Sequence, residues 1–347
     1  MIPLSQHLMK ILKSAFLFIL AVIFFGSCNN ANRNQNAGNE EKQKQAEPMK
    51  IPLFNADSAY SYVKAQVDFG PRVNNTKAHD KCGTYLVKKL KQFCPDVIVQ
   101  KGQVKAFDGT MLNFQNLVAS FNPGTNNRIF LCSHWDSRPF ADQDPDVKKH
   151  NTPIDGANDG ASGVGILLEI ARQLSISKPA IGVDIIFLDA EDYGPPQDKK
   201  RNEDTTDWWG LGSQFWAKNP HKANYFAKYG ILLDMVGAPN ATFLQEEVSI
   251  KYAPAVLKNV WNIAGKLGYS DYFPFETAGG ITDDHYYINV FMNIPTIDII
   301  HLVNNSSKGR TDFYYTWHTT KDDMKSIDKT TLDVVGKTLM AVIANEK

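Results

Sequence analysis

Histidines and carboxylates that can bind a metal ion or transfer protons recur through most of the chain after residue 130. Several come directly after apolar runs: His134 follows RIFLCS, and the adjacent acids Glu191 and Asp192 follow VDIIFLDA. Taken singly, such a residue is more often a loop cap or a solvated side chain than a ligand. Together they form the imidazole and carboxylate set that suits zinc, and in a pair of neighbouring acids one can bind the metal while the other handles protons. The candidates are His134, Asp159, Glu191, Asp192, Asp234, Asp283 and His318.

The elements that must position these residues alternate between strand and helix. A helix is predicted after Thr76, where Cys82, Leu86 and Leu90 recur at helical spacing until Pro95 ends it. The apolar runs predict strands at 97–99, 113–121, 128–133, 183–188, 229–235 and 295–300. Further helices are predicted near 164–174, 212–218, 254–267 and 329–344.

This alternation predicts an α/β fold. Strands that are apolar along their whole length indicate a single-domain three-layer sandwich, in which helices cover both faces of a mostly parallel, mixed central sheet. Ligands of such sheets bind beyond the carboxyl ends of the strands. We therefore expect the candidate residues to meet at that edge.

Composition excludes several classes of protein. A hydrophobic content of 43% in 347 residues allows a large core, and 37 Lys plus Arg balance 37 Asp plus Glu. Without a basic excess, nucleic acid is not an expected partner. No repeat or second low-complexity break interrupts the region after residue 50, so we expect one catalytic domain at 51–347. We also expect a monomer, although no sequence feature determines the oligomeric state.

The N-terminal residues predict an export signal. Lys10 and Lys13 precede an apolar run of about twelve residues, too short for a membrane span, and Gly26 and Ser27 precede Cys28 as in a bacterial lipobox. We expect a lipoprotein signal peptide at 1–28 and a flexible tether at 29–50, which has almost no large apolar residue. The protein would then be lipid-anchored at the cell envelope rather than cytoplasmic, and would meet the membrane only through its anchor; an ordinary signal peptide with an incidental Cys28 is the alternative.

Seven motifs resemble the zinc exopeptidase family, which contains the di-zinc leucine aminopeptidases and the animal-type glutaminyl-peptide cyclotransferases. Their order and approximate spacing match from about Gly70 to the C-terminus. The motifs are SHWDS (133–137), GANDGASG (156–163), FLDAEDYG (187–194), GLGSQ (210–214), LLDMVGAPNATF (232–243), TDDH (282–285) and TWHT (316–319).

The resemblance implies a role for each candidate. Asp159, Asp192 and His318 match the zinc ligands, and Glu191 matches the general base. His134 and Asp234 match the further ligands with which aminopeptidases hold a second zinc, while cyclotransferases keep equivalents of both and carry one zinc. We therefore expect one zinc ion in a cyclotransferase and two in an aminopeptidase.

Three features favour the cyclotransferase branch. Trp317 matches a tryptophan that walls the glutamine pocket, GAPNATF matches the run after the catalytic aspartate, and Asp283 matches an acid that hydrogen-bonds to the counterpart of Asp234. The implied catalytic residues are Glu191, Asp234 and Asp283. The implied reaction converts the N-terminal glutamine of peptides or proteins to pyroglutamate and releases ammonia.

Other features depart from that branch. Asp192 replaces the usual glutamate ligand, Asp298 stands where animal-type enzymes have a histidine, and His301 comes too late to replace it. The run NDGASG also leans towards the aminopeptidases, so a di-zinc aminopeptidase stays open, as does a metal-free binding lipoprotein. The loop at 193–208 is expected to rim the site, with Trp208 or Trp209 either walling it or packed in the core.

Overall fold

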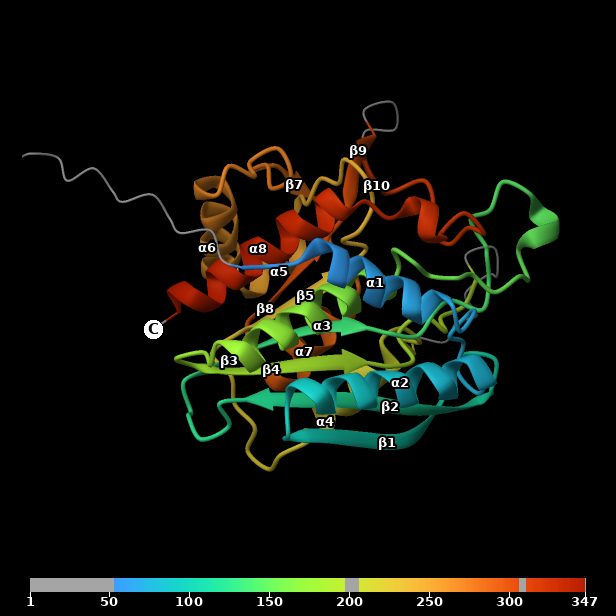
Figure 1. Ribbon diagram of the computed structural model, residues 1–347. Coiled ribbons are helices and arrows are strands. Elements are labelled where there is room, and N and C mark those ends of the chain that lie inside the picture. Colours follow the sequence, from blue (N-terminus) through green and yellow to red (C-terminus); the bar gives the residue numbers. More distant parts are fainter. Residues whose placement is uncertain (1–52, 197–205, 306–309, 347) are drawn as a thin grey trace, which may run out of the picture. The chain divides into compact units, whose positions relative to one another are not determined.

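A six-stranded sheet organises the computed structural model, which describes residues 53–196, 206–305 and 310–346 (Figure 1). The strand order is β1-β2-β4-β3-β5-β8. Strands β3, β4, β5 and β8 run parallel, whereas β2 pairs antiparallel with both β4 and β1. The strands are β1 (Val97–Lys105), β2 (Met111–Phe121), β3 (Arg128–His134), β4 (Gly182–Leu188), β5 (Gly230–Asp234) and β8 (Thr296–Ile300). The predicted mixed sheet is confirmed, although β1 is longer than the predicted strand at 97–99 because its outer half alternates between half-buried and exposed residues.

Helices cover both faces of the sheet, as alternate side chains of one strand show. Leu131 of β3 belongs to a core shared with one set of helices, and its neighbour Cys132 belongs to a second core with Trp216 and Ile288. The first core is shared with α1 (Ala56–Val67), α2 (Lys77–Phe93), α3 (Ala161–Ile176), α6 (Pro254–Lys266) and α8 (Lys329–Asn345). The second is shared with α4 (Leu211–Lys218) and α7 (Asp284–Met292). The three-layer sandwich is therefore confirmed.

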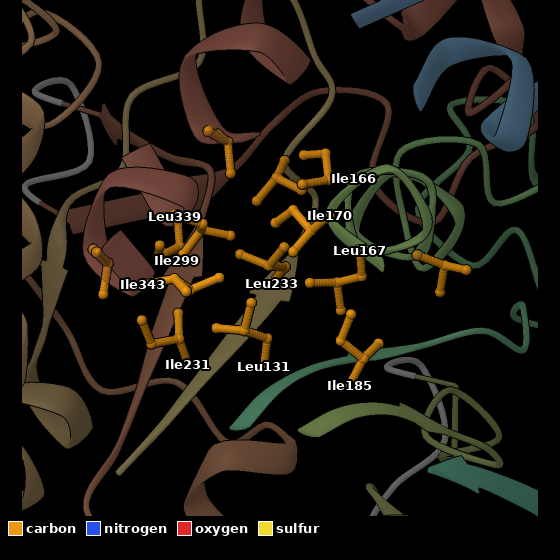
Figure 2. Packing of buried hydrophobic residues seen from close by; sticks show 14 of the residues in the cluster. Leu131, Ile166, Leu167, Ile170, Ile185, Ile231, Leu233, Ile299, Leu339 and Ile343 are labelled. Carbon is orange, nitrogen blue, oxygen red and sulfur yellow. The ribbon is translucent and has the colours of Figure 1, made fainter. Parts of the chain in front are cut away.

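Figure 2 shows how the first core is filled. Ile166, Leu167 and Ile170 of α3 point towards the side chains of the parallel strands, and Leu339 and Ile343 of α8 reach the same layer. Apolar packing thus holds α3 against the sheet. The loop that leads into α3 carries one of the candidate ligands.

The remaining elements are short. They are β6 (Gln245–Glu246), α5 (Glu247–Tyr252), β7 (Thr277–Ala278), β9 (Leu302–Asn305), β10 (Arg310–Phe313) and two 3₁₀ turns (Val147–Lys149 and Met324–Ser326). The backbone N–H of Asp298 in β8 donates to the hydroxyl of Ser249 in α5 at 2.9 Å. A helix side chain therefore satisfies part of an otherwise unpaired sheet edge.

Some predictions fall on parts of the chain that the structure does not describe. The predicted signal peptide at 1–28, including Cys28, and the tether at 29–50 lie outside the described residues, as do residues 197–205 of the predicted rim loop. Within the described residues, no helix has both the length and the apolar character needed to cross a membrane.

Candidate active site

The candidate residues meet at the carboxyl ends of the central strands. His134 ends β3, Asp234 ends β5, and Glu191 and Asp192 follow the end of β4 at Leu188 after two further residues. Asp159 lies just before α3, and His318 lies beyond β10. All of these side chains are buried. The expectation that they lie at this edge of the sheet is confirmed.

One group of three contains the predicted zinc ligands. His318 Nε2 lies 3.4 Å from Asp192 Oδ1 and 3.8 Å from Asp159 Oδ2. One donor atom from each of Asp159, Asp192 and His318 lies within 4.8 Å of the others, close enough to share one metal ion. Asp192 Oδ2 is buried and has no hydrogen-bond partner in the described part of the chain. An unpaired carboxylate oxygen at this depth is the arrangement expected of a metal ligand.

A second group shares Asp159 with the first. His134 Nε2 lies 3.0 Å from Asp159 Oδ1 and 3.1 Å from Asp234 Oδ1. Although burial opposes protonation, contacts with Asp136, Asp159 and Asp234 raise the pKa of His134 well above its usual value. A protonated His134 can therefore neutralise the two carboxylates in place of a metal ion.

Glu191 lies beside both groups. Its backbone N–H and that of Asp192 donate to the two oxygens of Asp136, each at 3.1 Å, so one carboxylate fixes both acids. Ala190 takes a positive φ of 54°, which turns the chain sharply after β4. Burial, together with the like charges of Asp283 and Asp192, raises the pKa of Glu191 well above its usual range despite the opposing charge of His134. A carboxyl group tuned upwards in this way suits proton transfer near neutral pH.

Mutual repulsion also raises other carboxyl pKa values. Burial and the charge of Asp159 raise the pKa of Asp192, and the same two causes raise the pKa of Asp234 to about 7. Buried acids that resist joint ionisation are stabilised by a cation between them. The donor set and its electrostatics therefore both fit zinc.

Sequence reasoning missed Arg138 and Asp142, which support the first group. Arg138 pairs with Asp142 through contacts of 2.7 and 3.0 Å, and its Nη1 lies 3.5 Å from Asp192 Oδ1. Asp142 Oδ1 in turn lies 3.3 Å from His318 Nδ1. A carboxylate against the outer nitrogen of a ligand histidine fixes the ring and leaves the other nitrogen for the metal. The spacing of Arg138 and Asp142 is a weak signal that sequence alone could not distinguish from an ordinary surface pair.

Asp322 was also missed, and it holds the loop that carries Asp159. Its two oxygens accept hydrogen bonds from the backbone N–H groups of Asn158 and Asp159 at 2.8 and 3.0 Å. Gly160 follows with φ of 88°, and a Cβ atom there would lie 2.8 Å from His134 Cε1. Only glycine therefore lets the loop pass this close to His134.

Aromatic rings flank His318. The Trp317 ring stacks on the imidazole at 3.8 Å between centroids, and the Trp209 ring lies nearly parallel to it at 6.2 Å. Trp209 also lies over the guanidinium of Arg138 at 4.9 Å. Both Trp208 and Trp209 are half-buried, and Trp209 is the one whose ring adjoins the ligand histidine.

Asp283 and Asp298 form a third buried group with His285. One donor atom from each of the three lies within 4.8 Å of the others. The like charge of Asp283 contributes to the raised pKa of Asp234, after burial and Asp159. His301 lies apart from this group and stacks on Tyr314 at 4.7 Å. Asp298, rather than His301, therefore takes part in the acid network.

The sequence matches one family profile over much of its length. The profile of Peptidase family M28 covers residues 116–343. Among curated relatives, the glutaminyl-peptide cyclotransferase of Bos taurus is 25% identical over 258 residues, which cover 67% of this chain and 66% of the bovine protein. The chain thus spans just under two thirds of the length of that relative.

Solved structures share the fold and much of the sequence. A glutaminyl cyclase from Bacteroides thetaiotaomicron, bound to N-acetylhistamine, has a TM-score of 0.82 and 53% identity over 86% of this chain and 100% of that one. A zinc-dependent exopeptidase from Parabacteroides distasonis has the same TM-score of 0.82 and 53% identity, over 85% of this chain and 100% of that one. The fold therefore has counterparts among zinc-dependent exopeptidases and glutaminyl cyclases.

Proposed function

The chain belongs to peptidase family M28, and on that premise we propose that it is a zinc-dependent glutaminyl-peptide cyclotransferase. It converts the N-terminal glutamine of peptides or proteins to pyroglutamate and releases ammonia. The observation that carries this proposal is the buried meeting of Asp159, Asp192 and His318 beside Glu191, with Trp317 stacked on His318. The similarity of the chain to glutaminyl cyclases supports the cyclotransferase branch of the family.

Asp159, Asp192 and His318 would hold one zinc ion. The chemistry that a bound zinc supplies here is Lewis-acid polarisation of the glutamine γ-carbonyl. Arg138 and Asp142 hold Asp192 and His318 in place, and Asp322 does the same for Asp159. Removing zinc should therefore abolish activity without unfolding the sheet, because the ligands are supported by protein contacts of their own.

Glu191 moves the proton. The α-amine of the substrate loses a proton to Glu191 as its nitrogen bonds to the γ-amide carbon. Glu191 then gives that proton to the amide nitrogen as the carbon–nitrogen bond breaks, so ammonia leaves and the ring is closed. The raised pKa of Glu191, caused first by burial, favours the return of the proton. Because the amine and the amide belong to one residue, the site orients two groups that are already joined and does not have to bring two molecules together.

Trp317 supplies the wall against which the substrate side chain lies. Its ring stacks on His318, so an apolar surface adjoins the metal ligands. Asp234 and Asp283 would act with Glu191 as a network of carboxyl groups around the reacting amine. Two such acids share protons rather than ionise together, which keeps the network partly protonated near neutral pH.

A di-zinc aminopeptidase is the second candidate, and the second group of donors favours it. His134, Asp159 and Asp234 lie close enough to share an ion. The similarity of the chain to glutaminyl cyclases favours the first candidate. We therefore expect one zinc per chain.

A substrate pair separates the two candidates. Purified protein should release ammonia and form pyroglutamate from a glutaminyl peptide, and it should leave a leucyl peptide intact. Glu191→Gln protein, prepared in parallel, controls for spontaneous cyclisation. Free leucine from the second peptide, together with two zinc ions per chain, would replace the cyclotransferase by an aminopeptidase.

A further inference from the structure

Three buried titratable residues next to Asp283 have no part in the mechanism above. Glu246, His285 and Asp298 come from β6, α7 and β8, and each is 0% exposed. Buried acids of this kind are retained only where other groups satisfy them. The partners of these three side chains therefore indicate their role.

His285 lies between two carboxyl groups. Its Nε2 is 3.3 Å from Glu246 Oε1, and its Nδ1 is 3.9 Å from Asp298 Oδ2. His285 is in the first turn of α7, and Asp283 is the N-cap residue of the same helix. Glu246, His285, Asp298 and Asp283 therefore form a continuous buried row that ends at the acid network of the site.

Glu246 anchors this row. Its carboxylate accepts hydrogen bonds from the backbone N–H groups of Val248 at 2.7 Å and Ile281 at 3.3 Å, and from that of Ser249. The hydroxyl of Ser249 in turn accepts a hydrogen bond from the backbone N–H of Asp298 at 2.9 Å. The same contacts thus fix Glu246 and the backbone that carries Asp298.

Asp298 differs from Glu246 because no group in the described part of the chain donates a hydrogen bond to its carboxyl oxygens. Neither of its side-chain oxygens has a hydrogen-bond partner among the described residues. Burial, followed by the like charges of Asp283, Asp234 and Glu246, raises the pKa of Asp298 well above its usual range. Asp298 is therefore a neutral carboxyl group with a proton to donate.

Asp283 is the acceptor within reach. Its Oδ1 accepts the backbone N–H of Asp284 at 2.5 Å, and its Oδ2 is buried without a partner in the described structure. Asp283 and Asp298 have oxygens within 4.8 Å of each other and interact through their side chains. If the carboxyl group of Asp298 carries a proton, it can donate a hydrogen bond to Asp283 Oδ2, and both buried groups then have a partner.

We propose that Asp298 is a positioning residue for the cyclisation, whose neutral carboxyl group donates a hydrogen bond to Asp283 and so holds Asp283 beside Asp234. The hydrogen bond from the backbone N–H of Asp298 to Ser249 fixes the part of β8 that carries this carboxyl group. The inference rests on the proposed function, and it explains how an acid serves at a position where the family resemblance predicts a histidine: both side chains can donate one hydrogen bond.

Two near-isosteric variants test it. Asp298→Asn keeps a donor, so its kcat should stay within about threefold of wild type, whereas Asp298→Leu fills the space without a donor and should lower kcat by about tenfold or more. KM should change little in both, because Asp298 does not touch the substrate. Zinc content should stay near wild type in both, because Asp298 is not one of the proposed zinc ligands, whereas Asp298→Leu should melt at a lower temperature because it leaves Asp283 Oδ2 without a donor.

Thr296→Val is the matched control on the same strand. Thr296 is buried, and its hydroxyl donates to the carbonyl of Ile294 at 2.9 Å, so the variant loses a hydrogen bond remote from Asp283. Its kcat should equal that of wild type. An equal fall in Asp298→Asn and Asp298→Leu would overturn the donor role, as would full activity in Asp298→Leu or a loss of zinc in either variant. A wild-type enzyme that forms no pyroglutamate would instead overturn the proposed function. The two failures are distinguishable, because the role of Asp298 is judged only against an active wild-type enzyme.

Discussion

Glu191 and Asp192 are neighbours in the chain, but different partners surround their carboxyl groups. Asp192 lies between Arg138 and His318, at 3.5 and 3.4 Å, whereas the pKa of Glu191 is governed by burial and by other acids. Arg138 also donates to the carbonyl oxygens of Asp192 and Gly194, so the backbone of this segment is held along with the side chain. These contacts can place the shorter arm of an aspartate where the family resemblance predicts a glutamate ligand.

His301 gives a prediction about stability at low pH. It is 1% exposed, and burial lowers its pKa to about 4. The pKa of a histidine in the unfolded chain is about 6.5. Between about pH 6.5 and about pH 4, His301 is therefore protonated in the unfolded state but not in the folded state. The stabilisation present above pH 6.5 is therefore lost as the pH falls through 4, and it amounts to a few kcal/mol.

Urea unfolding of zinc-free protein at several pH values measures this loss. In His301→Gln the free energy of unfolding should fall less steeply between about pH 6.5 and about pH 4, since glutamine does not titrate. Wild-type protein measured at the same pH values is the reference. An identical slope in His301→Gln would show that His301 accepts its proton without cost.

At the scale of elements, the loop that enters α3 sets the distance between two candidate ligands. Gly160 and Gly268 have almost the same backbone angle, with φ of 88° and 86°, but only at Gly160 would a Cβ atom meet other atoms, at 2.8 Å from His134 Cε1 and 2.9 Å from the Asp136 carbonyl oxygen. Gly268→Ala should therefore cost about 1–2 kcal/mol of backbone strain and leave zinc binding unchanged. Gly160→Ala should lose zinc and activity in addition.

Zinc titration of both variants, followed by thermal unfolding, compares the two effects. The shared angle makes Gly268→Ala a matched control for backbone strain. Equal zinc affinity in the two variants would mean that the close approach of the loop to His134 has no part in building the site.

The elements that position the site were predictable because their patterns are strong. The apolar runs before His134, Glu191 and Asp234 are central strands buried on both faces, and such strands have few alternatives. The helix α7 was not predicted, because DHYYINVFM mixes apolar and polar residues without a clear helical face. Its beginning depends on the N-cap at Asp283, which was singled out only as a candidate catalytic acid.

The predicted site residues came together because strand ends meet at one edge of a parallel sheet. The supporting residues were not predictable in the same way. Asp322 reaches Asn158 across 164 positions, and Asp136 holds Glu191 across 55. Contacts over such separations depend on how loops fold over the sheet, and no local pattern encodes them. Asp298 did leave a signal, as a single acid within an apolar strand.

At the scale of the whole molecule, the catalytic domain holds its site through long-range contacts of buried polar residues. Arg72, which is 0% exposed, donates to the carbonyl oxygens of Trp135 at 2.9 Å and Gly156 at 2.7 Å. The segment after α1 thus ties the loop after β3 to the loop before α3. A substitution that removes Arg72 would leave buried carbonyl groups unpaired, so the whole site depends on the intact domain.

We also propose that a lipid on Cys28 tethers this domain at the cell envelope as a monomer. The protein should be labelled by a fatty acid and partition into detergent, and Cys28→Ala should abolish both. Deleting residues 29–50 should leave cyclisation unchanged, because their composition cannot form a core. An unlabelled wild-type protein in the aqueous phase would rule out the anchor.

Zinc content and cyclisation rate, measured in the same preparations of Glu191→Gln and Asp192→Asn, test the central claim most directly. Glu191→Gln keeps its volume but cannot accept a proton, so zinc should stay near wild type while turnover falls by about a hundredfold or more. Asp192→Asn removes a charged ligand, so zinc and activity should fall together and recover in part with excess zinc. Zinc loss in Glu191→Gln instead, or a normal rate in that variant, would contradict the assignment of Glu191 as the base and Asp192 as the ligand.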